Sequence, residues 1–254
     1  MQIRILSADD VRTALPMPKA IEAMKRAFGQ FSAGQATVPL RPHISTDKGV
    51  TLFMPAYLHE SRDLGIKVVS VYGDNPSSGL PRITATVLLL DPQTGLPKAF
   101  MDGSSLTAIR TGAGGGLAAE LLSRRDAKTV GLFGAGVQAR AQLRGVMAVR
   151  EVKRVNLISR TQASAQKFAA EIAAWENAPA VNLVSTPRQA VQDADIVITA
   201  TTSSRPLFDG VDLKPGVHVT AVGSFTQEKR EVDTATVRRA RWIVVDSREA
   251  CLAE

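Results

Sequence analysis

The sequence has few of the residues that build disulfide scaffolds, metal sites and base-stacking surfaces. It contains one cysteine, Cys251, and three histidines, and aromatic residues make up 5% of its 254 residues. A single cysteine excludes an intrachain disulfide, and the scattered histidines lack ligand spacing, so we expect no metal ion. Few aromatic side chains leave few platforms for stacked bases, which argues against a nucleic-acid partner.

The chain also lacks a long apolar run and a secretion signal. No stretch approaches the roughly 20 apolar residues that span a membrane, and the first ten residues hold no apolar core with a cleavage site. With the single cysteine, these absences predict a cytoplasmic protein with no membrane partner. The net charge of +7 comes from dispersed basic residues, which can steer an anionic cofactor or a carboxylate substrate.

The most informative stretch, KTVGLFGAGVQARAQL, predicts a buried strand, a glycine-rich turn and a helix. Within it, Gly134, Gly136 and Ala139 have the G-x-G-x-x-G/A spacing of dinucleotide-binding folds. Gly134 permits a tight turn, Gly136 lets the backbone approach a pyrophosphate, and Ala139 allows the helix to pack closely on the strand. The pyrophosphate would bind at the N-terminus of that helix.

The remainder of the C-terminal half alternates between strands and helices, which predicts a doubly wound parallel sheet. The predicted strands are 154–159, 181–184, 194–201, 216–223 and 241–246, and the predicted helices are 163–175, 188–193 and 234–240. The glycine-rich turn follows the strand at 129–133, which precedes this series and is the first strand of the domain. The pattern therefore indicates a Rossmann-type domain rather than an ordinary glycine-rich turn.

The end of the second strand of this domain indicates NADP rather than NAD. NAD-binding domains commonly carry an acid here for the ribose 2′-hydroxyl, but this chain carries Ser159, Arg160 and Thr161. A guanidinium can bind the 2′-phosphate of NADP and stack on adenine, and Ser164 would add a hydroxyl donor. The alternative is a solvated loop arginine.

The N-terminal half predicts an α+β domain with antiparallel strands. A capping box at Ser7–Asp10 opens a short helix. Further helices are expected at 18–31 and 104–123, and strands at 50–54, 65–71, 83–90 and 97–101. The predicted fold is α/β, with this domain at residues 1–125 and the dinucleotide-binding domain at residues 126–254.

Six motifs in the same order resemble the ornithine cyclodeaminase/mu-crystallin family. They are MPAY (54–57), GIKVV (65–69), ATVLLLDPQTG (85–95), MDGSSLTAIRTGA (101–113), FGAGVQA (133–139) and AVGSF…RE (221–231). The resemblance covers nearly the whole chain and implies a homodimer whose N-terminal domain binds substrate and mediates dimerisation. Family chains usually continue with a segment that returns to the first domain, and this sequence stops before it.

The resemblance also implies roles for individual residues. Arg41 and Arg110 match the carboxylate-binding arginines of the family, and Lys67 matches its active-site lysine. Met54 is expected in the substrate pocket, with plain core packing as the alternative. Without the resemblance, Lys67 would be interpreted as a solvent-facing residue of an edge strand. The expected cofactor contacts are Thr111, Gly134, Gly136, Val137, Gln138, Ala139, Ser159, Arg160, Thr161, Ser164, Thr201 and Val222.

One departure from the family pattern narrows the expected reaction. Members that deaminate ornithine or oxidise alanine carry an acid shortly after the Val-Gly pair, where this chain has Ser224 and Phe225. A phenyl ring cannot exchange a proton. We therefore expect NADPH-dependent reduction of a cyclic ketimine carboxylate, Δ1-pyrroline-2-carboxylate or Δ1-piperideine-2-carboxylate, to proline or pipecolate. The alternatives are an ornithine cyclodeaminase or alanine-dehydrogenase-like enzyme, an enzyme of open-chain imino acids, and a non-catalytic NADP-dependent binding protein of mu-crystallin type.

Overall fold

The computed structural model describes residues 2–40, 42–224 and 226–253, so Arg41 and Phe225 lie outside the described residues. The chain divides into two compact units, residues 1–110 and 111–254. Their boundary falls inside helix α3 (Gly103–Leu122), whereas the sequence-based boundary was placed after this helix. Among the described residues, no helix is long and apolar enough to cross a membrane.

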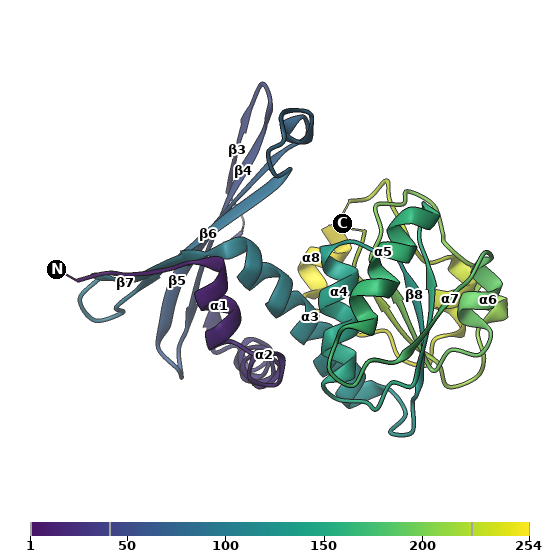
Figure 1. The fold of residues 1–254 in the computed structure, drawn as a ribbon. Coiled ribbons are helices and arrows are strands. Elements are labelled where there is room, and N and C mark those ends of the chain that lie inside the picture. Colours follow the sequence, from purple (N-terminus) through teal and green to yellow (C-terminus); the bar gives the residue numbers. More distant parts are fainter. Residues whose placement is uncertain (1, 41, 225, 254) are drawn as a thin grey trace. The chain divides into compact units, whose positions relative to one another are not determined.

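A seven-stranded sheet forms the centre of the first unit (Figure 1). Its strands are β1 (Arg4–Leu6), β2 (Ala36–Thr37), β3 (His43–Thr46), β4 (Gly49–Leu58), β5 (Asp63–Tyr72), β6 (Ile83–Leu90) and β7 (Pro97–Asp102). The order is β1-β7-β6-β5-β4-β2, and β3 also pairs with β4. The predicted antiparallel pairing of the four long strands is confirmed. The sequence analysis missed β1, which pairs in parallel with β7.

The helices of the first unit are α1 (Ala8–Ala14), α2 (Met17–Ser32), the first turns of α3 and the 3-10 helix η1 (Asn75–Ser78). The predicted capping box opens α1, because the Ser7 hydroxyl accepts from Asp10 N and the Asp10 carboxylate accepts from Ser7 N. The first residue of α3 packs on Ala85, which is buried in the sheet. Ala85 and Ala99 are both buried and lie on the same face of the sheet, so this is its covered face.

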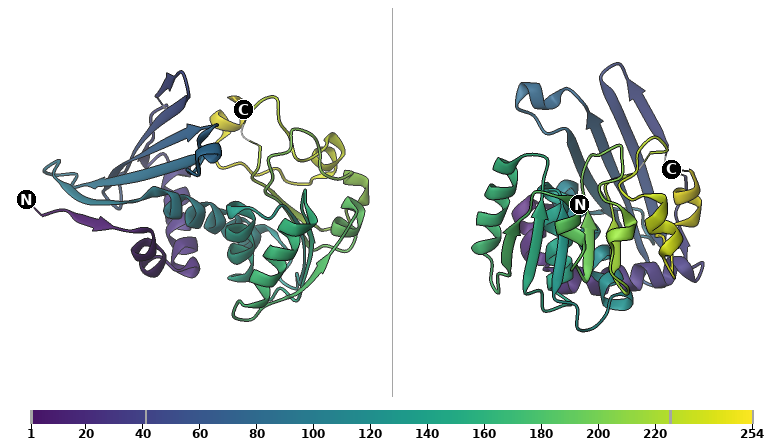
Figure 2. Two further views of the ribbon diagram at one scale, coloured as in Figure 1. Left: turned by 45° about the horizontal axis from the view of Figure 1, so that its top comes forward. Right: turned by 90° about the vertical axis from the view of Figure 1, so that its right-hand side faces the viewer.

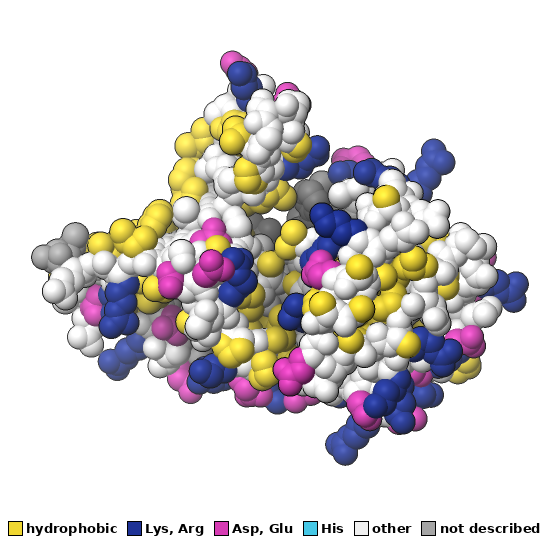
Figure 3. Space-filling view, in the orientation of Figure 1, with side chains coloured by type: hydrophobic (Ala, Val, Ile, Leu, Met, Phe, Trp, Pro, Cys, Tyr) yellow, Lys and Arg dark blue, Asp and Glu magenta, His cyan; other side chains and the backbone are white. Residues whose placement is uncertain are grey.

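The opposite face of this sheet is exposed. Ile5 and Phe100 are register partners on β1 and β7, and 76% and 42% of their surfaces are accessible. Their neighbours in sequence point the other way, because side chains alternate between the faces of a strand. Figure 3 shows hydrophobic side chains gathered along the strands of this unit. A monomer of this unit would thus leave apolar surface in water.

The second unit contains a five-stranded, entirely parallel sheet (Figures 1 and 2). Its strands are β8 (Thr129–Phe133), β9 (Arg154–Ile158), β10 (Ala180–Leu183), β11 (Ile196–Thr199) and β12 (His218–Ala221). Its further helices are α4 (Val137–Met147), α5 (Gln162–Ala173), α6 (Pro187–Val191), η2 (Gly210–Asp212), α7 (Thr234–Arg239) and α8 (Arg248–Ala253). The order β10-β9-β8-β11-β12 is that of the first five strands of a Rossmann fold, as predicted.

The predicted sixth strand at 241–246 is wrong, because this segment forms no strand. Its apolar side chains are exposed, Trp242 by 74% and Ile243 by 66%. Apolar and β-branched residues favour a strand, but a strand also needs a neighbour for its N–H and C=O groups. Among the described residues, the only strand that pairs with β12 is β11. The composition of the segment was therefore misleading without a partner.

Close contact between α3 and α4 fixes the start of the second unit. A Cβ atom on Gly112 would overlap the carbonyl of Ala141, and one on Gly115 would overlap the side-chain oxygen of Gln142. The Gln142 amide donates to Thr111 O over 2.8 Å. The glycine-rich part of α3 thus packs closely against α4, and Thr111 is held beside α4.

Aromatic contacts join α4 to α5. The Arg140 guanidinium lies 4.4 Å from the ring centroid of Phe168, and the Arg144 guanidinium lies 4.0 Å from that of Trp175. Both distances are within the range of a cation–π interaction. The two aromatic rings also contact each other, with centroids 6.1 Å apart. These contacts fix the helices that flank β8 and β9.

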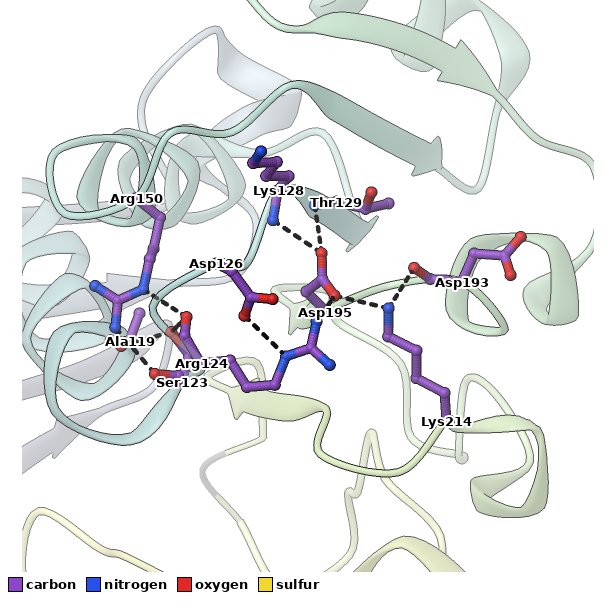
Figure 4. A network of polar contacts seen from close by, with 10 residues as sticks. All are labelled: Ala119, Ser123, Arg124, Asp126, Lys128, Thr129, Arg150, Asp193, Asp195 and Lys214. Atoms are coloured by element: carbon purple, nitrogen blue, oxygen red, sulfur yellow. Dashed lines mark hydrogen bonds and ion pairs between the residues drawn. The ribbon is translucent and has the colours of Figure 1, made fainter.

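A polar network ties together the amino ends of β8 and β11 (Figure 4). The Asp195 carboxylate accepts from Lys128 N and Thr129 N over 2.8 and 2.9 Å, from Arg124 over 3.0 Å and from Lys214 over 2.7 Å. Burial by itself would raise the pKa of Asp195, but the hydrogen bonds from Lys214 and the two N–H groups lower it overall. This network stabilises the sheet edge opposite the glycine-rich turn.

Candidate functional site

The glycine-rich turn has the geometry that its sequence predicts. Gly134 has φ +106°, and a Cβ atom there would lie 2.6 Å from Ala200 O, so only glycine fits. Gly136 is the N-cap of α4, and a Cβ atom on it would meet nothing within 4 Å. Ala139 is fully buried in the core. The backbone at Gly136 is therefore open to a ligand while the rest of the turn is packed.

The Arg140 side chain, on α4, forms hydrogen bonds with the backbone of the glycine-rich turn. Its guanidinium donates to the carbonyl oxygens of Ala135 and Gly136, the latter over 3.1 Å. It also forms an ion pair with Glu171, whose carboxylate lies 2.6 Å from Arg140 Nε. The carbonyl oxygens of the turn are thus engaged inside the protein. The N–H groups at the start of α4 have no side-chain cap among the described residues and suit an anion.

Several buried polar atoms near the start of α4 and at the carboxyl end of β12 lack a hydrogen-bond partner among the described residues. They include Gln138 Oε1, Thr111 Oγ1 and Ser224 Oγ. Buried polar atoms are normally satisfied by protein, water or ligand. Val137, next to Gln138, is 66% exposed. The open backbone of Gly136 and the exposed Val137 fit a bound dinucleotide at the start of α4.

The second strand of the sheet ends at the residues expected to contact the ribose. Ser159 and Arg160 follow β9, and Arg160 is exposed. Thr161 is the N-cap of α5, where its hydroxyl accepts from Ser164 N over 3.3 Å. The Thr161 and Ser164 hydroxyls lie 2.7 Å apart. Two hydroxyl groups, the N-terminus of α5 and the exposed Arg160 thus follow β9, next to the glycine-rich turn.

Thr201 and Val222 follow β11 and β12 at the same edge of the sheet. Val222 N donates to Thr199 O over 3.0 Å, which continues the ladder one residue past β12. The Thr201 hydroxyl donates to Glu231 over 2.6 Å and accepts from Ser203 N. The Thr201 hydroxyl is therefore engaged within the protein.

Glu231 is the residue of this region that the sequence analysis missed. It is 1% exposed and accepts hydrogen bonds from Thr199, Thr201 and Gly223. The available signal was its place at the end of the AVGSF…RE motif. Its neighbours Lys229 and Arg230 make the stretch look like a solvated charged loop, and this hid the burial of the carboxylate.

In the first unit, Lys67 lies on a central strand. β5 is flanked by β4 and β6, and the register partners of Lys67 are Met54 and Val87. Val87 lies two residues from the buried Ala85 on β6, so Lys67 is on the covered face of the sheet. The lysine is half-buried. This placement excludes the edge-strand interpretation and puts Met54 beside Lys67.

Arg110 ends the first unit, on α3. Its side chain is exposed and lines a pocket of about 550 Å³ within this unit, together with Leu106, Gln30 and Leu58. The structure thus brings Lys67 and Met54 together, and places the expected cofactor residues of the second unit along one edge of its sheet. The other expected arginine, Arg41, lies outside the described residues.

The parallel sheet, its strand order and the glycine-rich turn define the class: a Rossmann-type dinucleotide-binding fold preceded by an α+β unit. The chain belongs to the ornithine cyclodeaminase/mu-crystallin family, whose model matches residues 1–253. The resemblance noted from the six motifs is confirmed.

Two curated relatives and one solved structure illustrate the similarity. The Delta(1)-pyrroline-2-carboxylate reductase of Bacillus cereus is 36% identical over 252 residues, 98% of this chain and 77% of that protein. The ketimine reductase mu-crystallin of Mus musculus is 34% identical over 259 residues, 98% of this chain and 80% of that protein. The structure of Thermococcus litoralis Delta(1)-pyrroline-2-carboxylate reductase in complex with NADH and L-proline has a TM-score of 0.92 and 40% identity, covering 99% of this chain and 78% of that chain.

Proposed function

We propose that the protein reduces a cyclic ketimine carboxylate, Δ1-pyrroline-2-carboxylate or Δ1-piperideine-2-carboxylate, to proline or pipecolate with a reduced nicotinamide dinucleotide. The observation that carries this proposal is the likeness, at 40% identity over 99% of the chain, to a reductase solved with NADH and L-proline. The position of Lys67 on the covered face of a central strand, beside Met54, supports it, because the family resemblance assigns the active-site lysine to this residue. In this proposal the first unit binds the substrate and the second binds the dinucleotide.

The roles of the chain's own residues follow from their chemistry. Arg41 and Arg110 bind the substrate carboxylate through charge-assisted hydrogen bonds and so orient the imine carbon. The Lys67 ammonium lies at the imine nitrogen, where it stabilises charge and supplies the proton that the nitrogen gains. The N–H groups at the start of α4 hold the pyrophosphate over Gly136. When bound, the reduced nicotinamide supplies the hydride that the imine carbon accepts.

The assay that tests this function follows oxidation of NADPH and NADH with cyclic ketimine carboxylates, with keto acids plus ammonia, and with keto acids plus methylamine. We expect turnover with the cyclic substrates and none of the ammonia release from ornithine that a cyclodeaminase gives, because Phe225 cannot act as an acid or base. Binding of the dinucleotide without oxidation by any imine would favour a non-catalytic binding protein. Conversion of ornithine to proline would contradict the proposed reaction.

The dinucleotide is proposed to be NADPH. This proposal is supported by Arg160, which stands exposed beyond β9 beside the hydroxyls of Thr161 and Ser164. A guanidinium–phosphate contact contributes about 1.5–3 kcal/mol, so NADPH should bind at least about tenfold more tightly than NADH. Isothermal titration with both dinucleotides measures the ratio.

Arg160→Asp should reverse that preference, because a carboxylate repels the 2′-phosphate and accepts from a ribose hydroxyl. Arg154→Asp is the matched control, since Arg154 is an exposed arginine at the opposite end of the same strand. It should leave the ratio unchanged. Equal dissociation constants for NADPH and NADH in the wild-type protein would remove the basis for NADPH.

We also propose that the protein is a homodimer formed through the first unit. The exposed apolar face that carries Ile5 and Phe100 supports this, because a monomer would leave that surface in water. Light scattering after gel filtration should give twice the mass of one chain.

A further inference from the structure

We propose that Glu231 is a positioning residue that holds the ends of β11 and β12 in the arrangement that binds the nicotinamide half of the dinucleotide. This inference rests on the proposed function, because it assumes that a dinucleotide binds along this edge of the sheet. It assigns a role to a buried acid that takes no part in the reduction itself.

The Glu231 carboxylate connects the two strand ends directly. Oε1 accepts from Thr201 N over 2.7 Å and from the Thr201 hydroxyl over 2.6 Å. Oε2 accepts from Gly223 N over 2.7 Å and from the Thr199 hydroxyl over 2.8 Å. Each oxygen thus binds one backbone N–H, one from the loop after β11 and one from the loop after β12. These four donors offset the cost of burying the carboxylate.

The Glu231 carboxylate links β11 and β12 beyond the last backbone hydrogen bond between them. Beyond Val222 N, which donates to Thr199 O, the loops after β11 and β12 are joined through Glu231. A Cβ atom on Gly223 would overlap the Glu231 carboxyl group and Thr201 O, so glycine is required at this contact. The main chain of Glu231 is itself tied down by Leu207 N, which donates to its carbonyl over 2.9 Å. Glu231 is therefore held by hydrogen bonds at both its side chain and its main chain.

The segment that Glu231 holds lies against the glycine-rich turn. Ala200 N donates to Phe133 O over 3.0 Å, and Ala200 O is the atom that a side chain on Gly134 would strike. The sheet order places β9 on one side of β8, and β11 and β12 on the other. A dinucleotide whose ribose lies at the end of β9 and whose pyrophosphate lies at the turn must extend its nicotinamide half over β11 and β12.

A buried hydroxyl group without a hydrogen-bond partner among the described residues lies directly after Gly223. This group is Ser224 Oγ. A displacement of Gly223 would move this hydroxyl, together with the backbone around it. Glu231 therefore acts on ligand binding through the loops and not by contact with the ligand.

Glu231→Gln tests the proposal with little change in shape. Each carboxylate oxygen faces a backbone N–H, so the amide NH2 must face one of the two whichever way the glutamine turns. Either the loop after β11 or the loop after β12 then loses its backbone hydrogen bond to residue 231. We expect the dinucleotide that the wild type prefers to bind about tenfold more weakly, while its adenosine half, 2′,5′-ADP for NADPH or ADP for NADH, changes less than about twofold.

The matched control is Asp233→Asn. Asp233 also accepts from backbone N–H groups and a threonine hydroxyl, but it holds η2 and the start of α7 through Gly210 and Thr236. This variant should lower the melting temperature and leave the ratio of dinucleotide to fragment affinity unchanged. If Glu231→Gln does not fold, Thr199→Val removes one of the four bonds and should give the same selective loss, about threefold.

The measurements distinguish failure of the proposed function from failure of the positioning role of Glu231. If the wild-type protein binds neither NADPH nor NADH, the proposed function fails. If the wild type binds one of them, and the variants weaken dinucleotide and fragment equally or not at all, Glu231 is only a structural residue and the positioning role is overturned.

Discussion

At the scale of single residues, the register of the first sheet changes the meaning of Lys67. A lysine that alternates with Ile66 and Val68 in a sequence can belong to the wet face of an edge strand. The pairing of β5 with both neighbours and the burial of Ala85 place Lys67 on a covered face of a central strand instead. A lysine on a covered face is a candidate for substrate chemistry, which is the role that the family resemblance implies for Lys67.

Lys67→Met should mainly lower kcat, by about ten- to a hundred-fold, because it keeps the apolar stem and removes the charge at the reacting nitrogen. The affinity for the dinucleotide should not change, since that half of the site belongs to the second unit. Lys98→Met is the control: Lys98 lies on β7 of the same sheet, and its side chain is 54% exposed. A wild-type kcat in Lys67→Met would show that Lys67 takes no part in the reaction.

Arg110→Ala should instead raise KM, by about ten- to a hundred-fold, with a smaller effect on kcat. A guanidinium that binds the carboxylate contributes alike to the bound substrate and the transition state. Steady-state kinetics with Δ1-pyrroline-2-carboxylate measures both constants. A fall in kcat at unchanged KM would assign Arg110 to the reacting centre rather than to the carboxylate.

At the scale of elements, the glycine-rich turn shows two glycines with opposite requirements. Gly134→Ala should destabilise the fold by more than about 2 kcal/mol, because φ is positive and the Cβ atom would strike Ala200 O. Gly136→Ala should leave the melting temperature nearly unchanged, since φ is −88° and the space is open. It should nevertheless weaken dinucleotide binding about tenfold or more, because the methyl group occupies the pyrophosphate path.

Thermal unfolding and titration calorimetry distinguish these effects. If both variants lost stability equally, the space over Gly136 would not be open. If neither lost affinity, the pyrophosphate would have to bind elsewhere.

The elements show where sequence reasoning succeeds and where it stops. The strands and helices of the second unit were predictable because apolar runs, turns and the glycine spacing agree with one another. The segment 241–246 was not, because its composition resembles that of β12 but it pairs with no strand among the described residues. β1 was missed because only three residues pair, and their partner on β7 is almost a hundred residues away in the chain.

Some residues of the candidate site were also predictable from the sequence, and others were not. The spacing of Gly134 and Gly136 predicts their geometry, because backbone conformation depends on the local sequence. The burial of Glu231 depends on two strand ends that are distant in sequence and converge only in the folded sheet. No local pattern separates such a carboxylate from the charged residues beside it.

At the scale of the whole molecule, His218 makes stability depend on pH. Burial, and secondarily the charge of Arg150, lower the pKa of His218 to about 4. An unfolded histidine titrates near 6.5, so between these values the unfolded chain binds more protons than the folded one. The free energy of unfolding should therefore fall as the pH drops from about 6.5 to 4, by up to about 3 kcal/mol.

Urea unfolding at pH 7 and at pH 4.5 measures this loss. His218→Gln keeps a group that can reach Thr220 Oγ1, now 2.9 Å from His218 Nε2, and should unfold with a flatter pH dependence in this window. The buried carboxylate of Asp195, whose pKa is lowered, contributes mainly at more acidic pH. Equal slopes for wild type and variant would show that His218 is accessible to protons in the folded state.

The two tryptophans, Trp175 and Trp242, give the protein a built-in optical signal. Trp175 is partly buried and lies under the Arg144 guanidinium, whereas Trp242 is 74% exposed. A collisional quencher such as iodide should therefore extinguish the red-shifted emission of Trp242 first and leave the emission of Trp175. The emission that remains overlaps the absorption of reduced nicotinamide, so loading of the second unit can be followed by energy transfer without any attached dye.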